Sequence, residues 1–456
     1  MFKKVIEQFF RAPARALEKT VEFAEREERK IISKNPIQVA EEYWNTLGPG
    51  LTTGAADDDP SGVATYSQMG ARYGFQLLWL SLFTFPFMAI VQEMCARIGL
   101  VTGQGLASNI RRHYPRRILY GVTALLFFAN TLNIAADLGA MAASAKLLIP
   151  HINLIAFVAF FAIASLLLQI FTTYARYARY LKYTTLALFS YVFTAFAVHL
   201  NWREAFAHTL IPSFTFSKDQ VFLVCAVLGT TISPYLFFWQ TSQEVEEQIL
   251  RGEKTIGERK TGFDARQLNH MRFDVWSGMF FSNAIMFFII AACAATLYAH
   301  GITTITGAEQ AALAIRPFAG ELTYFFFAMG IIGTGLLATP VLAGSTAYAL
   351  AESFNWKQGL YRKLSEAYTF YGVIIVSMLI GILMNFIRID PIKALIYSAV
   401  ANGFIAPIVL FFVVSMSASQ KIMADNKNHP VLTACGWLII AVMGFAGVAA
   451  MASLFL

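Results

Sequence analysis

Apolar residues along this chain gather in runs of about 20, the length that a helix needs to cross a hydrocarbon core of about 30 Å. Short polar loops separate eleven such runs, and we expect each run to form a membrane-spanning helix. Their approximate limits are 43–70, 75–100, 117–148, 152–172, 181–200, 220–248, 273–300, 322–352, 367–387, 393–416 and 431–454. The pattern therefore predicts an all-α polytopic membrane protein.

The first run is interrupted in its middle by a polar motif. The motif consists of Asp57, Asp58, Asp59, Pro60, Ser61 and Gly62. Charge at bilayer depth is costly and tends to mark a transport pathway or a ligand site. Non-helical backbone is tolerated there only where protein buries it or where it lines a wet cavity. We therefore expect a broken helix whose carboxylates and freed carbonyls face a cation.

The sixth run carries a second interruption, Gly229-Thr230-Thr231-Ile232-Ser233-Pro234-Tyr235. Proline removes one backbone donor and clashes with the preceding turn, which leaves carbonyls near Thr230 without intrahelical partners. An inverted repeat of five helices would place this span opposite the first one, at the same depth. The alternative interpretation is an ordinary proline kink in a packed helix.

Basic residues are distributed unevenly among the loops. With the N-terminus inside, Lys and Arg in the inner loops outnumber those in the outer loops by about three to one. This bias is the positive-inside pattern, and it predicts a multi-pass protein of the inner (plasma) membrane with a cytoplasmic N-terminus. It also accounts for the formal charge of +7, so we expect no nucleic-acid partner.

Composition agrees with this class, because 57% of the residues are hydrophobic and only 14% are charged. The charged first forty residues do not resemble a cleavable signal peptide. They form either an amphipathic helix on the inner leaflet or a polar tail. The cysteines fall within apolar segments without metal-ligand spacing, so we expect small core residues.

Three motifs stand in the first and third runs, namely Gly48-Pro49-Gly50, Asp59-Pro60-Ser61-Gly62 and Ala136-Asp137-Leu138-Gly139. The first two resemble the first-helix GPG and DPGN elements of the NRAMP family of divalent metal transporters, and the last resembles part of that family's third helix. The resemblance extends from about Leu47 to the tenth span. It implies the LeuT fold, with two inverted five-helix repeats, here followed by an eleventh transmembrane helix.

This fold divides the chain into four parts. They are a cytoplasmic N-terminal segment (1–42), a first repeat with spans one to five (43–200), a second repeat with spans six to ten (201–416) and the eleventh span (417–456).

The departures from the family pattern carry most of the functional information. The family's coordinating asparagine is replaced by Gly62, and its sixth-helix Met-Pro-His by Ser233, Pro234 and Tyr235. Loss of a soft thioether removes discrimination against Mg²⁺, which prefers oxygen ligands and keeps several of its waters. The smaller side chains are expected to enlarge the cavity. These features resemble a divergent branch of NRAMP-related magnesium transporters.

The resemblance implies a set of site residues for a hydrated Mg²⁺ or Mn²⁺ ion. Asp59 would be the main charge partner, and Asp58 would act directly or through bound water. Ala56 and Thr230 would offer backbone carbonyls, while Ser233 and the backbone of Gly62 would line the wall. Further candidates for the cavity lining are Tyr235, Gln240, Asp137 and Asn402.

Proton coupling is expected to be absent. Histidine is the side chain that normally titrates near neutral pH, and Tyr235 and Gln240 stand at the two sixth-helix positions where the family has it. Ala140 stands at the position of a third-helix glutamate that the family associates with proton movement. Asp137 could act as a relay or could pair with Lys146.

We therefore predict a secondary transporter of divalent cations, without a cofactor, acting as a monomer in the lipid bilayer by alternating access around its broken first and sixth helices. A rival interpretation is a carrier of an organic cation such as guanidinium or an amine, held by Asp58 and Asp59 against the ring of Tyr235 or Trp239. A membrane sensor or enzyme is a third alternative. The chain is not expected to be an enzyme, because it offers no nucleophile-and-base arrangement, nucleotide loop or metal-ligand histidine pair.

Overall fold

The computed structural model describes residues 44, 47–172, 174–215, 217–305, 307–387 and 391–455. The expected N-terminal segment 1–42 lies outside this part of the chain. A compact body begins at Pro49 and forms a unit distinct from the residues before it. All elements assigned within the described ranges are helices, which confirms the predicted all-α class.

The helices of the first half correspond closely to the predicted spans. They are α3 (Pro49–Asp57), α4 (Pro60–Tyr73), α5 (Trp79–Thr102), α6 (Leu106–His113), α7 (Arg116–Leu148), α8 (Leu154–Phe171), α9 (Tyr174–Thr184) and α10 (Phe189–Ala197). Those of the second half are α11 (Trp202–Leu210), α12 (Lys218–Thr231), α13 (Pro234–Leu250), α14 (Ile256–Gly262), α15 (Ala265–Thr296), α16 (Ala308–Phe354), α17 (Tyr368–Phe386), α18 (Pro391–Ser417), α19 (Gln420–Met423) and α20 (Pro430–Phe455).

Eight helices in the described ranges are long and apolar enough to cross a membrane, and two bent pairs would raise this number to ten. The interrupted pair α3 and α4 is not among them, because its parts have only 9 and 14 residues. Together these elements account for all eleven expected ranges. The sixth expected span, although also interrupted, is counted among the eight as Lys218–Leu250.

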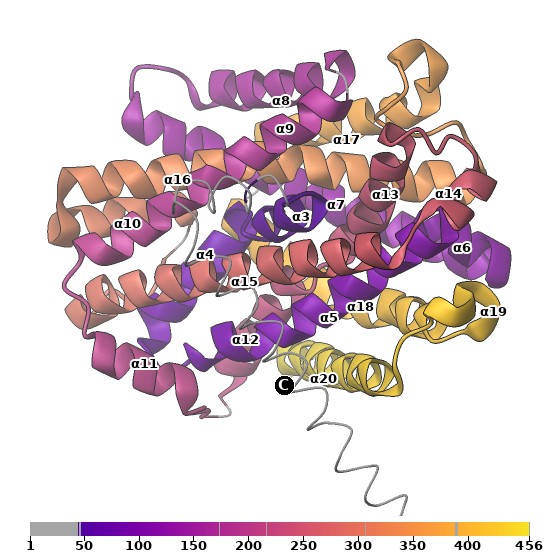
Figure 1. Ribbon diagram of the computed structural model, residues 1–456. Helices are drawn as coiled ribbons and strands as arrows, with labels where there is room; N and C mark the ends of the chain where they lie inside the picture. Colours follow the sequence, from indigo (N-terminus) through magenta and orange to yellow (C-terminus); the bar gives the residue numbers. More distant parts are fainter. Residues whose placement is uncertain are drawn as a thin grey trace, which may run out of the picture. The chain divides into compact units, whose positions relative to one another are not determined.

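The two broken spans lie beside each other within the body. Helix α4 contacts α12, α3 contacts α13, and α15 packs along α3, α4 and α5. In Figure 1, α3 lies in the middle of the helix bundle, whereas α6, α14 and α19 gather at one end and α11 lies near the opposite end. The interruptions are therefore surrounded by other helices, as backbone without helical hydrogen bonds at membrane depth requires.

Glycine permits the close approach of α3 and α15. A Cβ atom on Gly54 would lie 2.3 Å from the carbonyl oxygen of Gly278, and one on Gly278 would lie 2.2 Å from that of Gly50. These separations are far below van der Waals contact, so a side chain here would push the helices apart. Small residues at such contacts are typical of helix packing in membranes.

Candidate cation-binding site

The first interruption is a helix end followed at once by a new helix start. Helix α3 ends at Asp57, and Asp59 is the N-cap of α4, with its Oδ1 accepting a 2.7 Å hydrogen bond from the backbone N–H of Gly62. Pro60 occupies the first turn of α4, where its missing N–H costs nothing. The sequence Asp-Pro therefore stops one helix and starts the next.

The second interruption is built differently. Helix α12 ends at Thr231, and Ser233 precedes Pro234 at the start of α13, but its side chain does not cap that helix. Its hydroxyl lies 2.7 Å from the carbonyl oxygen of Thr230 and 2.8 Å from that of Gly229, and it donates back to them. The carbonyl of Thr230 lacks a helical N–H partner because Pro234 has no N–H, and that of Gly229 belongs to the last turn of α12, where carbonyls need other donors. Ser233 thus stabilises the end of α12.

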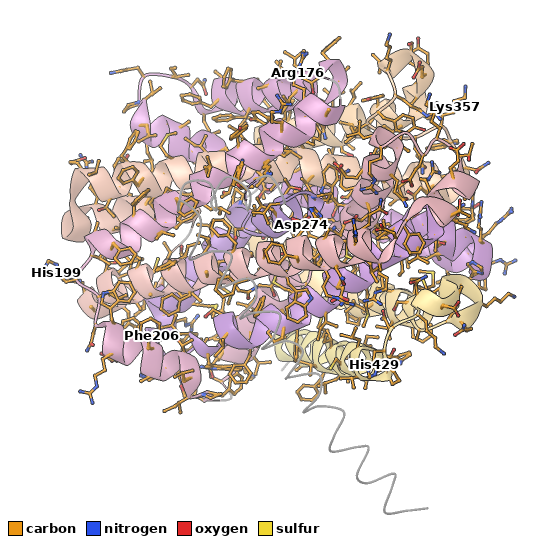
Figure 2. The ribbon with its side chains drawn as sticks, viewed as in Figure 1. Arg176, His199, Phe206, Asp274, Lys357 and His429 are labelled. Atoms are coloured by element: carbon orange, nitrogen blue, oxygen red, sulfur yellow. The ribbon has the colours of Figure 1, made fainter. Side chains whose placement is uncertain are left out.

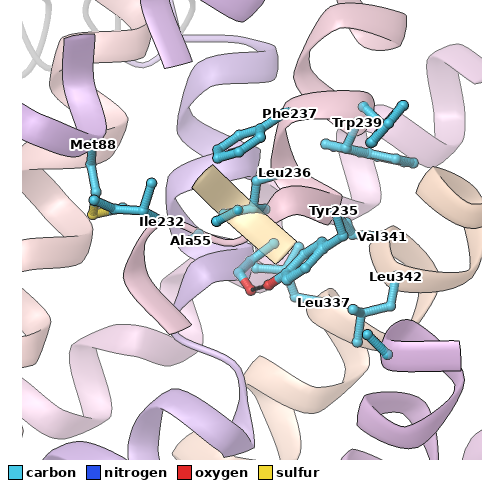
Figure 3. Packing of buried hydrophobic residues seen from close by; sticks show 14 of the residues in the cluster. Ala55, Met88, Ile232, Tyr235, Leu236, Phe237, Trp239, Leu337, Val341 and Leu342 are labelled. Atoms are coloured by element: carbon cyan, nitrogen blue, oxygen red, sulfur yellow. Dashed lines mark hydrogen bonds between the residues drawn. The ribbon is translucent and has the colours of Figure 1, made fainter. Parts of the chain in front are cut away.

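The two interruptions are in direct contact. The hydroxyl of Tyr235, on α13, donates a 2.9 Å hydrogen bond to the carbonyl oxygen of Ala56, at the end of α3. Figure 3 shows Tyr235 among the buried residues of this region, near Ala55 and Leu337. A Cβ atom on Gly62 would lie 3.5 Å from Oγ1 of Thr230. The structure therefore brings together residues that are about 170 positions apart in the sequence.

Three consecutive carboxylates at the first interruption have three different surroundings. Oδ2 of Asp57 accepts a 3.3 Å hydrogen bond from the hydroxyl of Ser282, on α15. Both carboxylate oxygens of Asp58 are buried and lack a hydrogen-bond partner in the described part of the chain. Oδ2 of Asp59 lies 3.5 Å from the amide nitrogen of Asn133, on α7.

Helix α7 adds a further carboxylate to the same place. Asp137 lies one turn beyond Asn133, it is fully buried, and neither of its oxygens has a hydrogen-bond partner among the described residues. It lies near the carboxylate of Asp59 and near the backbone N–H of Ser61, without a hydrogen bond of normal geometry to either residue. Lys146 is exposed farther along α7, so the pairing that we considered for Asp137 and Lys146 is not formed.

Buried negative charge without positive charge is the main property of this site. Within the described ranges, no Lys or Arg side chain forms an ion pair with the carboxylates of residues 57, 58, 59 and 137. Removing a carboxylate from water costs several kcal/mol unless a cation or hydrogen bonds compensate. The arrangement is therefore suited to a positively charged ligand.

The donor atoms around the site are hard. Carboxylate, hydroxyl, amide and carbonyl oxygens surround the two interruptions, supplied by α3, α4, α7, α12, α13 and α15. No group of three or more His, Cys, Asp or Glu side chains in the described ranges is arranged to hold a metal ion. A cation held here would therefore depend on backbone carbonyls and waters as well as on carboxylates.

The enlarged cavity stays a prediction. A Cβ atom on Gly62 would lie 3.0 Å from the carbonyl oxygen of Asp57, which is tight, and 3.4 Å from the ring of Tyr66, which is ordinary contact. The carbonyls of Ala56 and Thr230 also accept hydroxyl hydrogen bonds, although each oxygen has a second lone pair.

Three other candidate residues, Gln240, Asn402 and Trp239, form no hydrogen bond with these carboxylates in the described part of the chain. The amide nitrogen of Gln240 donates a 2.9 Å hydrogen bond to Glu244, one turn farther along α13. Oδ1 of Asn402, on α18, is buried without a partner in the described residues. The ring of Trp239 makes an edge-type contact with Tyr348, with centroids 6.3 Å apart.

Two acidic residues outside the site hold its supporting helices. Asp274, on α15, accepts hydrogen bonds of 2.6 and 3.1 Å from the backbone N–H groups of Gly50 and Leu51, at the start of α3. Figure 2 shows Asp274 near the centre of the view, in the N-terminal third of α15. Glu93, on α5, pairs with Arg97 as its spacing of four predicts, and it also accepts a 2.9 Å hydrogen bond from Arg272 on α15.

Sequence reasoning missed several residues that the structure adds. Asn133 lies four positions before Asp137, so helical periodicity could have placed both on one face of α7. Ser282 and Ser398 carried no such signal, because each is a single hydroxyl in an apolar span. The hydroxyl of Ser398, on α18, donates to Oδ1 of Asn133 and so orients its amide towards Asp59.

Comparisons with known proteins agree with the geometry. A family model described as natural resistance-associated macrophage protein-like (Nramp) matches residues 50–453. The chain is 27% identical over 406 residues to the divalent metal cation transporter MntH of Klebsiella pneumoniae, covering 87% of this chain and 91% of that protein.

Solved structures show the same fold at lower identity. A manganese transporter of Eremococcus coleocola matches with a TM-score of 0.69 and 17% identity, over 89% of this chain and 85% of that one. Mhp1, a nucleobase-cation-symport-1 family transporter, matches with a TM-score of 0.56 and 14% identity, over 89% and 90%. These similarities confirm the predicted LeuT fold.

Proposed function

The chain belongs to the Nramp family of membrane transporters, and from this premise we propose that it carries hydrated divalent cations, mainly Mg²⁺ and also Mn²⁺. Support for a divalent metal substrate comes from its relatives, which include a divalent metal cation transporter and a manganese transporter. The preference for Mg²⁺ rests on the residues of the site.

One observation carries the proposal, namely the buried carboxylates of Asp58, Asp59 and Asp137 beside two broken helices. Asp58 and Asp137 have no hydrogen-bond partner among the described residues, and Asp59 interacts electrostatically with Asp137. Neighbouring buried carboxylates that are all ionised repel one another unless they share a cation or a proton. A divalent cation would compensate two of these charges at once.

Ligand hardness favours Mg²⁺. Ser233 supplies a hydroxyl where a thioether would favour transition metals, and the remaining donors near the breaks are oxygen atoms. Mg²⁺ dehydrates reluctantly and usually keeps several waters. Within the described ranges no group of three or more His, Cys, Asp or Glu side chains is arranged to hold a metal ion, so waters would complete the coordination of an ion held here.

Alternating access would use the two broken spans. The site is buried from both sides in the described structure, since Asp59, Ser233 and Tyr235 are each 1% exposed. Opening towards one side requires relative movement of helices around this fixed point. We propose that the hydrogen bond between Tyr235 and Ala56 closes the site and breaks when α3 or α13 moves.

We propose that transport is not coupled to protons. A double charge gains roughly 4.6 kcal/mol per 100 mV, twice the value of about 2.3 kcal/mol for a single charge. An inside-negative potential could therefore drive Mg²⁺ uptake without a proton gradient. A glutamine amide does not titrate and a phenol ordinarily titrates well above neutral pH, so neither Gln240 nor Tyr235 can replace a histidine as a proton carrier.

The test is uptake into liposomes that contain the purified protein and an internal pH dye, at a clamped voltage. We expect Mg²⁺ and Mn²⁺ to enter, guanidinium to be excluded, and no acidification to accompany Mg²⁺. Acidification in a fixed ratio to Mg²⁺ would show proton coupling, with Asp137 as the first residue to examine. Entry of guanidinium in place of Mg²⁺ would support the organic-cation alternative.

A further inference from the structure

A polar cavity of about 230 Å³, separate from the candidate cation site, lies at the end of the bundle where α6, α13, α14 and the end of α16 meet. The loops at this end carry the excess of Lys and Arg, so the positive-inside rule predicts that it faces the cytoplasm. Figure 2 shows Lys357, which lines the cavity, at this end and His199 at the opposite one. The residues of the two helix interruptions are not part of its lining.

Basic residues from three segments line this cavity. They are Arg111 and Arg112 of α6, Arg259 of α14, and Lys357 and Arg362 of the loop after α16. Arg259 already donates hydrogen bonds to backbone carbonyls, and Arg111 donates to Asn355. Arg112 and Lys357 are exposed, and neither has a hydrogen-bond or ion-pair partner in the described structure. Such side chains are available to an anion.

The two acidic residues in the lining are already satisfied by the protein itself. Glu246 accepts hydrogen bonds from the hydroxyl of Tyr348 (2.5 Å) and from the backbone of Leu360 (2.8 Å). Glu352 accepts from the backbone of Ser108 (2.9 Å) and from the hydroxyl of Ser242 (3.2 Å). Both glutamates are 2% exposed. Their hydrogen bonds connect the walls of the cavity, and the exposed charged side chains in its lining are basic.

Two further observations concern polar groups of the lining whose surroundings favour an added hydrogen-bonding anion. Burial, and next the positive charge of Arg112, lower the pKa of Arg111, so these guanidinium groups are close enough to repel each other. Gln104 lines the cavity and is only 7% exposed, yet both polar atoms of its amide lack partners among the described residues. Buried amides are normally hydrogen-bonded.

The neighbouring surface has the character of a membrane interface. An open cavity of about 480 Å³ shares Arg111 and Arg112 with the first and adds Arg116, beside Tyr120 and Phe354. Tyr120 stacks on Phe354 with centroids 5.0 Å apart, and both rings are exposed. Exposed aromatic rings at helix ends are typical of the headgroup level of a bilayer.

We propose that these adjoining cavities bind the phosphate of an anionic phospholipid in the cytoplasmic leaflet. Arginine forks match phosphate oxygens in pairs, and Lys357 would add a single charge. Basic pockets beside transmembrane helices on the cytoplasmic side suit such headgroups. The aromatic rim favours a lipid over free phosphate, because its rings would contact the glycerol and acyl region.

The experiment is a titration of the full-length protein in detergent, with bound lipid counted by native mass spectrometry. Phosphatidylglycerol is compared with phosphatidylcholine, with and without inorganic phosphate as competitor. The test variant is the double substitution Arg112→Gln and Lys357→Gln, which removes exposed, unpaired charges. The matched control is Lys254→Gln with Lys260→Gln, because both lysines are exposed at the same end and neither lines the cavities.

We expect preferential binding of phosphatidylglycerol that the test variant weakens by roughly 25-fold, from about 1 kcal/mol per basic residue. The control should bind as the wild type does, and inorganic phosphate should compete only at high concentration. Equal weakening in both variants would overturn the site in favour of diffuse surface charge. Phosphate binding without a preference for phosphatidylglycerol would overturn the lipid as the source. Transport measurements do not enter this test, so it stands apart from the proposed function.

Discussion

The charge of Asp59 has two roles that a substitution can separate. Its carboxylate caps α4 through Gly62, and it faces Asn133 and Asp137 across the interruption. Asparagine caps helices about as well as aspartate does, so Asp59→Asn keeps the start of α4 while removing the charge.

We predict that Asp59→Asn abolishes Mg²⁺ uptake into liposomes and changes the free energy of unfolding by no more than about 1 kcal/mol. Asp425→Asn, at an exposed position outside the helix bundle's core, is the control and should transport normally. Uptake near the wild-type rate in the Asp59 variant would remove this carboxylate from the site.

The second prediction at this scale concerns selectivity. Ser233→Met places a soft sulfur beside the interruption, so competition by Mn²⁺ or Cd²⁺ against Mg²⁺ uptake should increase. The position is 1% exposed, and the larger side chain is expected to cost about 1–3 kcal/mol of stability.

Ser233→Ala is the matched variant for Ser233→Met, because it loses the hydroxyl and its hydrogen bonds to α12 without adding sulfur. A shift in selectivity that both variants share would come from the loss of the hydroxyl. A competition profile unchanged in Ser233→Met would mean that this wall does not face the ion.

At the scale of elements, the contact between α3 and α15 determines where the first interruption lies. Gly50, Gly54 and Gly278 let the two backbones approach, while Asp274 binds the first N–H groups of α3. The hydrogen bonds hold the start of α3, and the glycines allow its close approach to α15. Any widening of this contact would displace Asp57 and Asp58 at the other end of α3.

We predict that Gly54→Ala lowers the free energy of unfolding by about 1–3 kcal/mol, because its Cβ would lie 2.3 Å from the carbonyl oxygen of Gly278. Uptake should fall in the same variant. Gly121→Ala on α7 is the control, since no atom lies within 4 Å of its added Cβ, and alanine is the better helix former there. Thermal unfolding in detergent measures the stability of both variants. Equal stability of Gly54→Ala and Gly121→Ala would contradict the close packing.

At the scale of the whole molecule, the distribution of basic loops predicts the orientation in the membrane. Basic residues cluster at the end of the bundle that holds α6 and α14, and the end that holds α11 carries few of them. Their arrangement would place the N-terminus in the cytoplasm. The native cysteines are buried or half-buried, so added surface cysteines can report each side separately.

We predict that a membrane-impermeant thiol reagent added to whole cells labels His199→Cys and does not label Lys254→Cys. Both positions are exposed, and they belong to loops that the pattern assigns to opposite sides. Lysed cells should show labelling of both variants, which controls for reactivity. Labelling of Lys254→Cys alone in whole cells would reverse the orientation.

The sequence by itself determined the elements and the depth of the site. Apolar runs specified helices, because burying backbone polar groups in lipid requires local hydrogen bonding. Asp59-Pro60 and Ser233-Pro234 located both interruptions, since proline acts on its own turn. Both signals are local, and the helices begin at the two prolines as expected.

Only the tertiary structure decided which atoms meet at the site. The hydroxyl of Tyr235 meets the carbonyl oxygen of Ala56, and Asn133 and Asp137 lie beside Asp59. These contacts depend on the rotation and crossing of helices far apart in the sequence, and on glycine contacts that allow close approach. A hydropathy pattern indicates that a helix face is buried, but it does not indicate which helix covers that face.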